Sequence, residues 1–479
     1  AVMVWAVPGV VVENGTVREY NTKYAAHILG YIGPIWSAEA DEYREKGYSM
    51  NALVGKSGVE QAFEQYLHGS SGLKKTTVSS TGEILNRYYV TEPVPGNNVE
   101  LSIDISLQAV AEQSLEKVIL DLRENGVGRN KEGKDARGGA VVVQLCKTGE
   151  ILAMASYPTY DISTFNQDYE ALKEDEMNPL FNRALTAYPP GSVYKMVTSI
   201  AAVDLGGFDP GYIIEDKGLY TYYDSFQPKC HIWSLANPRT HGKINLMQAI
   251  AYSCNYYFYE VGRLTYNSYM EKTGENPFDI VAKALGELPE AVGARANAEE
   301  KNKQYAGEDA GWFGADVLQA VIGQSLNKFT PLQLANYVAT LVSGGEHYEA
   351  HLLKNVKSYD NSRVIGVYGK GPLNDLNISD STMAAVTKGM HDLTYDSLRS
   401  AFSRCVVEAG AKTGSAQVGT DIANGTFVAY APYDDPEIAI AIVVEKGGSG
   451  SLLANAAVDI INAWFTRDGT GATAAGEDA

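Results

Sequence analysis

The chain has 479 residues, of which 45% are hydrophobic and 20% are charged, the balance of a globular protein with two or more domains. Its formal charge of −19 argues against nucleic acid as a partner and against a purely electrostatic attachment to anionic lipid, because both require clustered Lys and Arg. No run of apolar residues is long enough to predict a membrane-spanning helix.

The N-terminal part of the chain is rich in turn residues and is predicted to form short strands and small helices. The run 10–17, with Asn14-Gly15 at its centre, is typical of a β-hairpin. Pro95-Gly96 then interrupts the chain, and we place a domain boundary there. The predicted organisation is a smaller N-terminal domain (1–96), a main domain (97–467) and a disordered tail of Gly, Ala, Thr and acidic residues (468–479).

The main domain is predicted to begin with a strand at 99–104 and a long helix with Asp104 as its N-cap. Hydrophobic periodicity and turn residues predict further elements in chain order: a hairpin of 140–143 and 150–156 that turns at 147–149, a polar surface excursion at 166–180, helices at 192–205, 244–250, 255–264 and 330–343, strands at 406–418, 426–431 and 438–444, and a helix at 452–466. Hairpins mixed with helices indicate an α+β fold, with helices against a largely antiparallel sheet.

Ser192 and Lys195 lie three residues apart at the start of a predicted helix. A serine hydroxyl is a weak nucleophile until a base removes its proton, and a neutral lysine one turn later can act as that base. Burial or a second cation must then lower the pKa of the lysine from about 10.4. Three other pairs share the spacing: Ser71/Lys74, Ser114/Lys117 and Ser325/Lys328. Only Ser192 follows a Pro-Pro-Gly turn at a helix start, where its own amide could bind an oxyanion.

Ser253 and Asn255 form a second motif, Ser-x-Asn, between two predicted helices. The hydroxyl can relay a proton, and the amide can hold a substrate peptide bond. The same pattern recurs at 49–51 and 325–327, where an N-cap or a loop residue explains it sufficiently. The tripeptide is therefore informative only in combination with other motifs.

Lys412-Thr413-Gly414 is the third motif and lies on a predicted strand, followed by Ser415. Lys and Thr on a strand can bind a carboxylate, and Gly lets a substrate strand approach the backbone. Lys-Thr-Gly recurs at 147–149, in a predicted hairpin turn, and at 272–274, in a predicted polar loop. Only the third occurrence is followed by a predicted antiparallel hairpin.

The three motifs in this order are those of serine β-lactamases and penicillin-binding proteins. Over residues 7–465 the chain resembles the class B penicillin-binding proteins, and its early runs are most similar to the elongation-type penicillin-binding proteins 2. The resemblance rests on these runs: 8–10, 26–33, 55–60, 101–104, 182–184, 188–192, 253–255, 323–324, 330–333 and 411–417.

The resemblance implies a transpeptidase domain with a five-stranded antiparallel sheet flanked by helices, carried on a smaller N-terminal pedestal. It also implies a membrane anchor and an Arg-Gly…Asp-Arg-Asn-Gly run near the start of the pedestal. Neither is present in this sequence, so we expect the chain to be truncated and its pedestal to be incomplete. No glycosyltransferase region is present, which distinguishes the chain from class A relatives.

The resemblance also implies roles for individual residues in this chain. These roles are as follows: Ser192 is the acylated nucleophile, Lys195 its base, Ser253 the proton relay to the leaving group, Asn255 a substrate-binding amide, Lys412 and Thr413 the ligands of the terminal carboxylate, Gly414 the point where the substrate strand approaches, and the backbone amides of Ser192 and Ser415 the oxyanion hole. No cofactor or metal is implied.

The implied reaction cross-links peptidoglycan stem peptides that end in D-Ala-D-Ala, and β-lactams are expected to inhibit it by acylating Ser192. The implied location is the outer face of the cytoplasmic membrane, with attachment only through the anchor that this sequence lacks. The implied partners are a membrane glycosyltransferase and elongation or division proteins, and not nucleic acid.

Three alternatives were weighed against a transpeptidase. A β-lactamase needs a deacylation base, in one class a Glu-x-x-x-Asn loop, and no convincing one lies between Asn255 and Lys412. A D,D-carboxypeptidase, with water as the acceptor, uses the same residues and stays open. A β-lactam sensor or a scaffold without turnover is disfavoured, because sensors of this type usually have an integral-membrane part and scaffolds usually lose part of the motif set.

The four cysteines are too sparse for a disulfide scaffold: Cys146, Cys230, Cys254 and Cys405. Cys230 and Cys254, with His231 and His241, resemble metal ligands by type but lack the Cys-x-x-Cys spacing of a zinc site. We therefore predict structural thiols and no metal. A bridge between Cys230 and Cys254 at the rim of the cleft is kept as a hypothesis.

Overall fold

We describe a computed structural model of the chain, which places residues 18–127, 131–235, 237–285, 312–324, 327–369, 371–419 and 422–467. The predicted hairpin at 10–17, the predicted tail at 468–479 and Ser325 lie outside these ranges. No helix within them is both long and apolar enough to cross a membrane.

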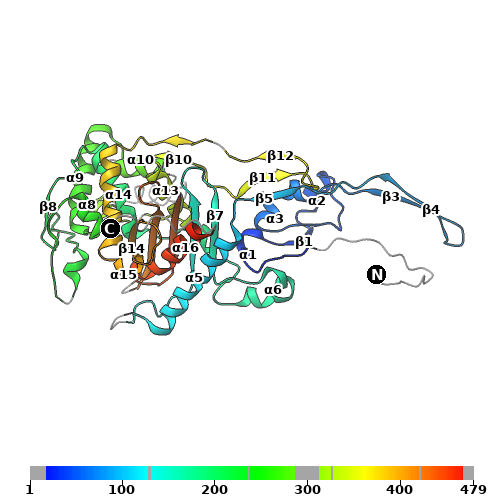
Figure 1. Ribbon diagram of the computed structural model, residues 1–479, viewed down its shortest axis with the longest axis horizontal. Coiled ribbons are helices and arrows are strands. Elements are labelled where there is room, and N and C mark those ends of the chain that lie inside the picture. The colour runs from blue at the N-terminus through cyan, green and yellow to red at the C-terminus, as the bar shows by residue number, and fades with distance from the viewer. Residues whose placement is uncertain are drawn as a thin grey trace, which may run out of the picture.

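A five-stranded antiparallel sheet forms the centre of the larger domain, in the order β14-β15-β16-β6-β7 (Figure 1). The predicted α+β class and the predicted five-stranded sheet are therefore confirmed. The strands are β6 (Gly139–Leu145), β7 (Ile151–Tyr157), β14 (Gly410–Gly419), β15 (Ile422–Ala431) and β16 (Ile438–Val444).

Helices cover both faces of this sheet, because successive side chains of β16 are buried in two different hydrophobic cores, one on each face. Ile440 and Ile442 belong to one buried core, whereas Ala441 and Val443 belong to the other. Residues of β16 are thus buried on both faces, which explains its continuous apolar sequence. The covering helices are α5 (Ile105–Asn125) and α16 (Ala454–Thr466) on the first face and α13 (Pro331–Val342) on the second.

A helical region lies beside the edge strand β14 and supplies much of the candidate site (Figure 1). Helix α14 packs against both α8 and β14, so it joins this region to the sheet. The elements here are η3 (Gly191–Tyr194), α7 (Lys195–Ile200), η4 (Ala201–Leu205), β8 (Ile214–Asp216), η5 (His231–Ser234), β9 (Gly242–Ile244), α8 (Leu246–Ala251), α9 (Asn255–Thr273), α10 (Pro277–Ala284), α12 (Gly314–Ala320), α14 (Asp380–Tyr395) and α15 (Arg399–Phe402).

The pedestal consists of small elements and one long projecting hairpin, β3–β4 (Figure 1). Nearly all residues of this hairpin are exposed. The elements are α1 (Ala26–Leu29), β1 (Ile32–Pro34), α2 (Ala40–Glu45), β2 (Leu53–Gly55), α3 (Gly58–Ala62), α4 (Glu64–Leu67), β3 (Leu73–Val78) and β4 (Ile84–Thr91).

The two parts are joined by a sheet that draws on distant segments. Strand β5 (Asn98–Leu101) pairs with β11 (Leu353–Lys357), which in turn pairs with β12 (Val364–Val367). If the domain boundary is placed at residue 96, strands β11 and β12, which come from much later in the chain, still pair with β5 beside the pedestal. The boundary at residue 96 stays a prediction. Smaller elements complete the chain: η1 (Ile162–Thr164), α6 (Phe165–Glu174), η2 (Arg183–Leu185), β10 (Glu346–His347), β13 (Asn374–Asp375) and η6 (Gly450–Leu453).

One buried carboxyl group fastens the pedestal to the larger domain. Glu112 on α5 accepts a hydrogen bond from the Ala25 amide through Oε1 at 2.7 Å, and Gln108 donates to the same oxygen at 2.8 Å. Ala25 has φ of 62°, a left-handed conformation that a residue with a Cβ adopts only when its surroundings hold it. Burial raises the pKa of Glu112 above its usual value.

Most predicted elements are confirmed within a few residues, including the Asp104 N-cap of α5, whose carboxylate accepts from the Ser106 and Leu107 amides. Three predictions were wrong in part. The excursion at 166–180 contains helix α6. Lys272 and Thr273 end helix α9, with Gly274 as its C-cap, instead of lying in a loop.

The third correction concerns β14, which begins at Gly410 and not at residue 406. Side chains bind the backbone ahead of it: Asn462 accepts from the Val406 amide, and Thr394 donates to the Ala409 carbonyl. These backbone groups are therefore not available for the sheet ladder. The predicted helix at 192–205 is continuous but begins as the 3₁₀ turn η3 and ends in the wider turn η4.

Candidate active site

Ser192 lies in a turn that is held from several directions. Gly191 has φ of 61°, which glycine adopts without a steric penalty, and its amide donates to the Gly323 carbonyl at 2.9 Å. Tyr337 on α13 donates to the Val193 carbonyl at 2.7 Å. As a residue in the first turn of η3, Ser192 has no acceptor for its amide within the helix. The turn thus presents a half-buried hydroxyl beside an available N–H group.

Lys195 begins α7 and is fully buried. Its Nζ donates to the Ser253 carbonyl at 2.7 Å, to Asn255 Oδ1 at 2.7 Å and to Ser253 Oγ at 3.1 Å. The ammonium also lies 5.4 Å from the centroid of the Phe258 ring. The structure therefore brings the first and second predicted motifs together. Within the described ranges, no hydrogen bond joins Lys195 Nζ to Ser192 Oγ.

Ser253 and Asn255 connect α8 to α9 and lie half-buried at the site. Ser253 has φ of 54°, a left-handed conformation that costs energy for a residue with a Cβ. Cys254 is the N-cap of α9, and its Sγ accepts from the Tyr257 amide at 3.5 Å. This turn directs both the carbonyl and the hydroxyl of Ser253 at Lys195.

Lys412 lies on the edge strand β14 and is also fully buried. Its Nζ donates to Ser253 Oγ at 2.9 Å and to the Thr413 carbonyl at 3.0 Å. One hydroxyl oxygen therefore lies between two lysine nitrogens. The side chains of Thr413 and Ser415 make no hydrogen bond within the described part of the chain, although Gln324 donates to the Ser415 carbonyl at 3.1 Å.

Burial sets the electrostatics of the two lysines. It lowers the pKa of Lys195 to about 8. For Lys412, burial and then the charge of Lys195 hold the pKa well below its usual value. No carboxylate within the described ranges forms an ion pair with either nitrogen. The sequence analysis required burial or a second cation to lower the pKa of Lys195, and burial is the main cause of the lowered pKa.

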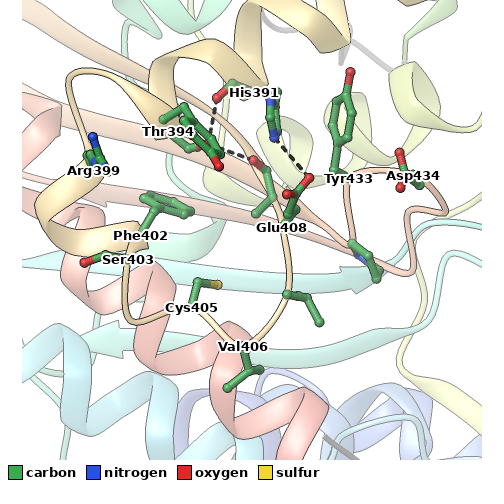
Figure 2. A pocket seen from close by; sticks show the side chains of 14 residues that line it. His391, Thr394, Arg399, Phe402, Ser403, Cys405, Val406, Glu408, Tyr433 and Asp434 are labelled. Carbon is green, nitrogen blue, oxygen red and sulfur yellow. Dashed lines mark hydrogen bonds and ion pairs between the residues drawn. The ribbon is translucent and has the colours of Figure 1, made fainter. Parts of the chain in front are cut away.

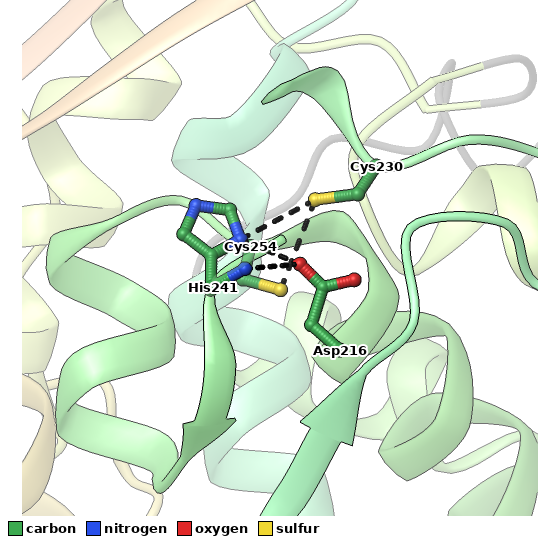
Figure 3. A group of neighbouring side chains, drawn as sticks. All are labelled: Asp216, Cys230, His241 and Cys254. Atoms are coloured by element: carbon green, nitrogen blue, oxygen red, sulfur yellow. Dashed lines mark hydrogen bonds and ion pairs between the residues drawn. The ribbon is translucent and has the colours of Figure 1, made fainter. Parts of the chain in front are cut away.

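A second cluster lies on the other side of the Ser253–Asn255 turn, and Figure 3 shows its four side chains converging. His241 Nδ1 lies 2.8 Å from Asp216 Oδ2 and 3.6 Å from Cys230 Sγ. Cys230 Sγ lies 3.8 Å from Cys254 Sγ, well beyond the 2.05 Å of a disulfide bond. All four candidate ligand atoms lie within 4.8 Å of one another.

Two thiols, one imidazole and one carboxylate are a donor set that suits tetrahedral Zn²⁺. Burial raises the pKa of Cys254, whereas its hydrogen bond lowers the pKa of Cys230. Burial would lower the pKa of His241, but Asp216 and Cys230 together raise it to about 9. These four residues could therefore hold a metal. The sequence indicated three of them, but it missed Asp216 and included His231, which is outside the cluster.

A pocket of about 710 Å³ lies away from these residues (Figure 2). It is bounded by α14, α15 and the segment ahead of β14, and Figure 2 shows His391 and Glu408 paired at its wall. Its lining includes Cys405 and Phe402 but none of the predicted site residues. Size alone does not mark the chemical site here.

Comparison with known families matches two regions of the chain. Residues 139–462 match the penicillin binding protein transpeptidase domain, and residues 4–101 match the penicillin-binding protein dimerisation domain. The peptidoglycan D,D-transpeptidase MrdA of Acinetobacter baumannii is 29% identical over 485 residues, which cover 96% of this chain and 67% of the relative. The chain spans about two thirds of the length of the curated relatives it matches.

Solved structures agree with these matches. The crystal structure of Pseudomonas aeruginosa PBP2 in complex with WCK 5153 has a TM-score of 0.73 at 26% identity, covering 94% of this chain and 91% of that one. The Helicobacter pylori complex between PBP2 and MreC has a TM-score of 0.72 at 25% identity, covering 94% and 78%. The chain therefore belongs to the penicillin-binding protein transpeptidases, as a class B member similar to the elongation-type MrdA or PBP2 proteins.

Proposed function

We propose that this chain cross-links peptidoglycan by D,D-transpeptidation through an acyl-enzyme on Ser192. The observation that carries the proposal is the convergence of two buried lysines on one hydroxyl, Ser253 Oγ, beside the turn that presents Ser192. A buried amine without a carboxylate partner favours its neutral form, and only the neutral form can accept a proton from serine.

Lys195 acts as the base in this proposal. Two of its three partners, the Ser253 carbonyl and Asn255 Oδ1, are pure acceptors. A neutral amine donates its two N–H groups to them and keeps its lone pair for a hydroxyl proton. The Ser192 proton then moves to Nζ as Oγ bonds to the substrate carbonyl carbon. Catalytic hydrogen bonds often tighten only when substrate is bound, so the missing bond to Ser192 is compatible with this role.

The oxyanion and the leaving group are served by neighbouring residues. The amides of Ser192 and Ser415 stabilise the negative oxygen, each contributing about 3 kcal/mol in the transition state. The carbon–nitrogen bond to the terminal D-alanine then breaks, and Ser253 passes a proton to the departing nitrogen. Lys412, Thr413 and Gly414 bind the end of the substrate strand, and Asn255 holds its peptide group.

An amine of a second stem peptide resolves the acyl-enzyme and regenerates Ser192. Water would give a D,D-carboxypeptidase with the same residues, so the acceptor must be measured. Release of D-alanine from a pentapeptide substrate is followed with and without an amine acceptor. A transpeptidase forms the amine-linked product in preference to the hydrolysed acid, whereas a carboxypeptidase forms the acid at the same rate in both cases.

The decisive experiment is intact-mass analysis after incubation with a penicillin. Ring opening adds the whole penicillin mass to the chain, with no group leaving. Wild-type chain and Ser71→Ala, from another Ser-x-x-Lys pair, are expected to label fully, and Ser192→Ala is expected to stay unlabelled. Equal labelling of Ser192→Ala contradicts the assignment. Labelling followed by rapid loss of the added mass would favour a β-lactamase.

The partners and location are proposed from relatives. The Helicobacter pylori relative was solved with MreC, which supports a role for this chain beside elongation proteins. Another similar structure concerns the coordination of polymerization and crosslinking by a peptidoglycan synthase complex, which supports a glycosyltransferase partner. We place this chain at the outer face of the cytoplasmic membrane. Co-purification of full-length protein with a tagged glycosyltransferase tests the assembly, and failure of both proteins to co-elute under membrane-solubilising conditions contradicts it.

A further inference from the structure

A buried hydroxyl on the second strand of the sheet holds the turn that carries Ser192. Thr426 on β15 has no exposed surface, and its Oγ1 donates to the Pro190 carbonyl at 2.7 Å. That carbonyl belongs to the peptide unit immediately before Gly191. None of the predicted motifs includes Thr426.

Gly414 and Thr426 face each other in the register of β14 and β15. A Cβ placed on Gly414 would lie 2.1 Å from Thr426 Oγ1, 2.8 Å from the Pro190 carbonyl oxygen and 3.3 Å from the Ser192 nitrogen. The space that glycine leaves at this position is therefore filled by the Thr426 hydroxyl from within the protein. The hydroxyl, the carbonyl and the Ser192 amide meet at one point.

The peptide unit between Pro190 and Gly191 is held at both of its ends. Thr426 binds its carbonyl, and the Gly323 carbonyl accepts from its N–H at 2.9 Å. Gly191 itself has φ of 61° and no Cβ, so steric contacts restrict its rotation weakly. The two hydrogen bonds therefore fix the plane of this peptide, which is the fixed end from which Gly191 turns to the next amide, on Ser192.

We propose that Thr426 is a positioning residue for acylation, which orients the Ser192 amide and hydroxyl through the Pro190 carbonyl. The inference rests on the proposed function of Ser192 and adds to it a residue that does not touch substrate. Loss of the hydroxyl leaves a buried carbonyl without a donor and releases one end of the peptide unit. The expected consequence is a misdirected oxyanion donor in a turn that is still folded.

Two substitutions separate the hydroxyl from the shape of the side chain. Thr426→Val keeps the volume and removes the donor, and its acylation rate constant with a fluorescent penicillin is expected to fall about tenfold. Thr426→Ser keeps the donor and loses a methyl group, and it is expected to acylate within about twofold of wild type. The non-covalent dissociation constant before acylation should change little in either variant.

Controls distinguish positioning from general loosening. Thr340 on α13 is also buried and donates to the Asn336 carbonyl at 2.9 Å, so Thr340→Val removes a comparable hydroxyl elsewhere. It should acylate at the wild-type rate. Thr426 forms no hydrogen bond with either lysine in the described part of the chain, so the pH midpoint of acylation should stay near 8 in Thr426→Val while the plateau falls.

Each result that differs from these expectations contradicts a specific part of the proposal. Acylation of Thr426→Val at the wild-type rate, or equal slowing in Thr426→Ser, removes the role of the hydroxyl. A shifted pH midpoint means that Thr426 acts through the lysine pair instead of the turn. Wild-type chain that does not label at Ser192 contradicts the proposed function itself, whereas wild-type labelling with an unaffected Thr426→Val contradicts this inference alone.

Discussion

Two polar clusters flank the same short turn, Ser253–Asn255, and they are built on opposite principles. On the lysine side, the amines of Lys195 and Lys412 both donate to one hydroxyl, and neither has a carboxylate partner in the described ranges. On the other side, Asp216 pairs with His241 beside two thiols. The first cluster holds two lysine amines without a carboxylate partner, and the second holds four side chains that could act as ligands of a metal cation.

The difference shows how the turn can be rigid and reactive together. Burial without a carboxylate partner lowers the pKa of a lysine, so that its amine can act as a base. This requires that no carboxylate forms an ion pair with the amine. The left-handed Ser253 must nevertheless stay in place, and Cys254 ties it to the second cluster. We infer that the lysine side supplies the chemistry and the other side supplies the anchorage. The following predictions test that division.

The largest effect is expected on the lysine side, from Lys195→Met. Removal of the base should slow acylation by a fluorescent penicillin about 10³-fold, in the range that general bases contribute. The Tm should not fall in proportion, because methionine fills the buried space without a charge. Stopped-flow or manual-mixing rates, compared at equal folded fraction by circular dichroism, measure this.

The matched control is Lys243→Met, which changes an exposed lysine on β9. It should leave the rate unchanged. If Lys195→Met acylates within about tenfold of wild type, the base must be the other buried amine, and Lys412→Met would then show the larger loss. Either result tells which nitrogen of the pair accepts the serine proton.

The second effect is expected on the opposite side, as a loss of stability. Chain grown with zinc is expected to contain about one Zn²⁺ by elemental analysis, because two thiols, one imidazole and one carboxylate suit that ion. Zinc at about a thousandfold of its Kd adds about 4 kcal/mol, so removal by a chelator should lower the Tm by roughly 8 °C. Differential scanning calorimetry before and after chelation measures the change.

Cys230→Ala and Cys146→Ala form the matched pair for this prediction, since both residues are buried thiols. Only the first should lose bound zinc and become insensitive to the chelator. Equal zinc content in both variants would show that the cluster is not a metal site. The anchorage would then come from hydrogen bonds alone, and the division between the two sides would be weaker than inferred.

The same comparison shows what the sequence could reveal. Ser192 and Lys195 are three residues apart at a predicted helix start, and Lys412 belongs to a Lys-Thr-Gly motif followed by a predicted hairpin, so local patterns singled out all three. Asp216 has no such signal, because it reaches Cys254 only through the folding of β8 against α9. Gly414 as the point where the substrate strand approaches stays a prediction, whereas the Thr426 hydroxyl, which lies where a Cβ on Gly414 would be, comes from the neighbouring strand and has no local signal in the sequence.

The fold follows the same rule. Strands β6–β7 and β14–β16 of the central sheet could be predicted from adjacent hairpins and apolar runs such as β16, whereas a sheet of five strands was implied only by the family resemblance. The pairing of β5 with β11 could not, because the two strands are far apart in sequence and neither is strongly patterned. Long-range pairing depends on packing of the whole domain, which a local pattern does not contain.

A smaller effect concerns pH and follows from the lowered pKa of Lys195, about 8 instead of 10.5. The base must be neutral, so below pH 8 the acylation rate should fall about tenfold for each pH unit. The unfolded chain binds the extra proton between pH 8 and 10.5, so the free energy of unfolding should rise with pH in that window. A flat rate profile, or a midpoint near 10.5, would contradict a buried, unpaired base.

The smallest effect is expected at Cys405, a half-buried thiol that lines the pocket of Figure 2 and belongs to neither cluster. Alkylation of native chain with N-ethylmaleimide should modify Cys405 first and leave acylation within about twofold, since burial protects the other thiols. When the chain is unfolded by a denaturant in the presence of a chelator, all four thiols should react with N-ethylmaleimide, because Cys230 and Cys254 are close but not bonded. Only two reactive thiols would establish the bridge between them, and the second cluster would then hold the turn by a covalent bond instead of a metal.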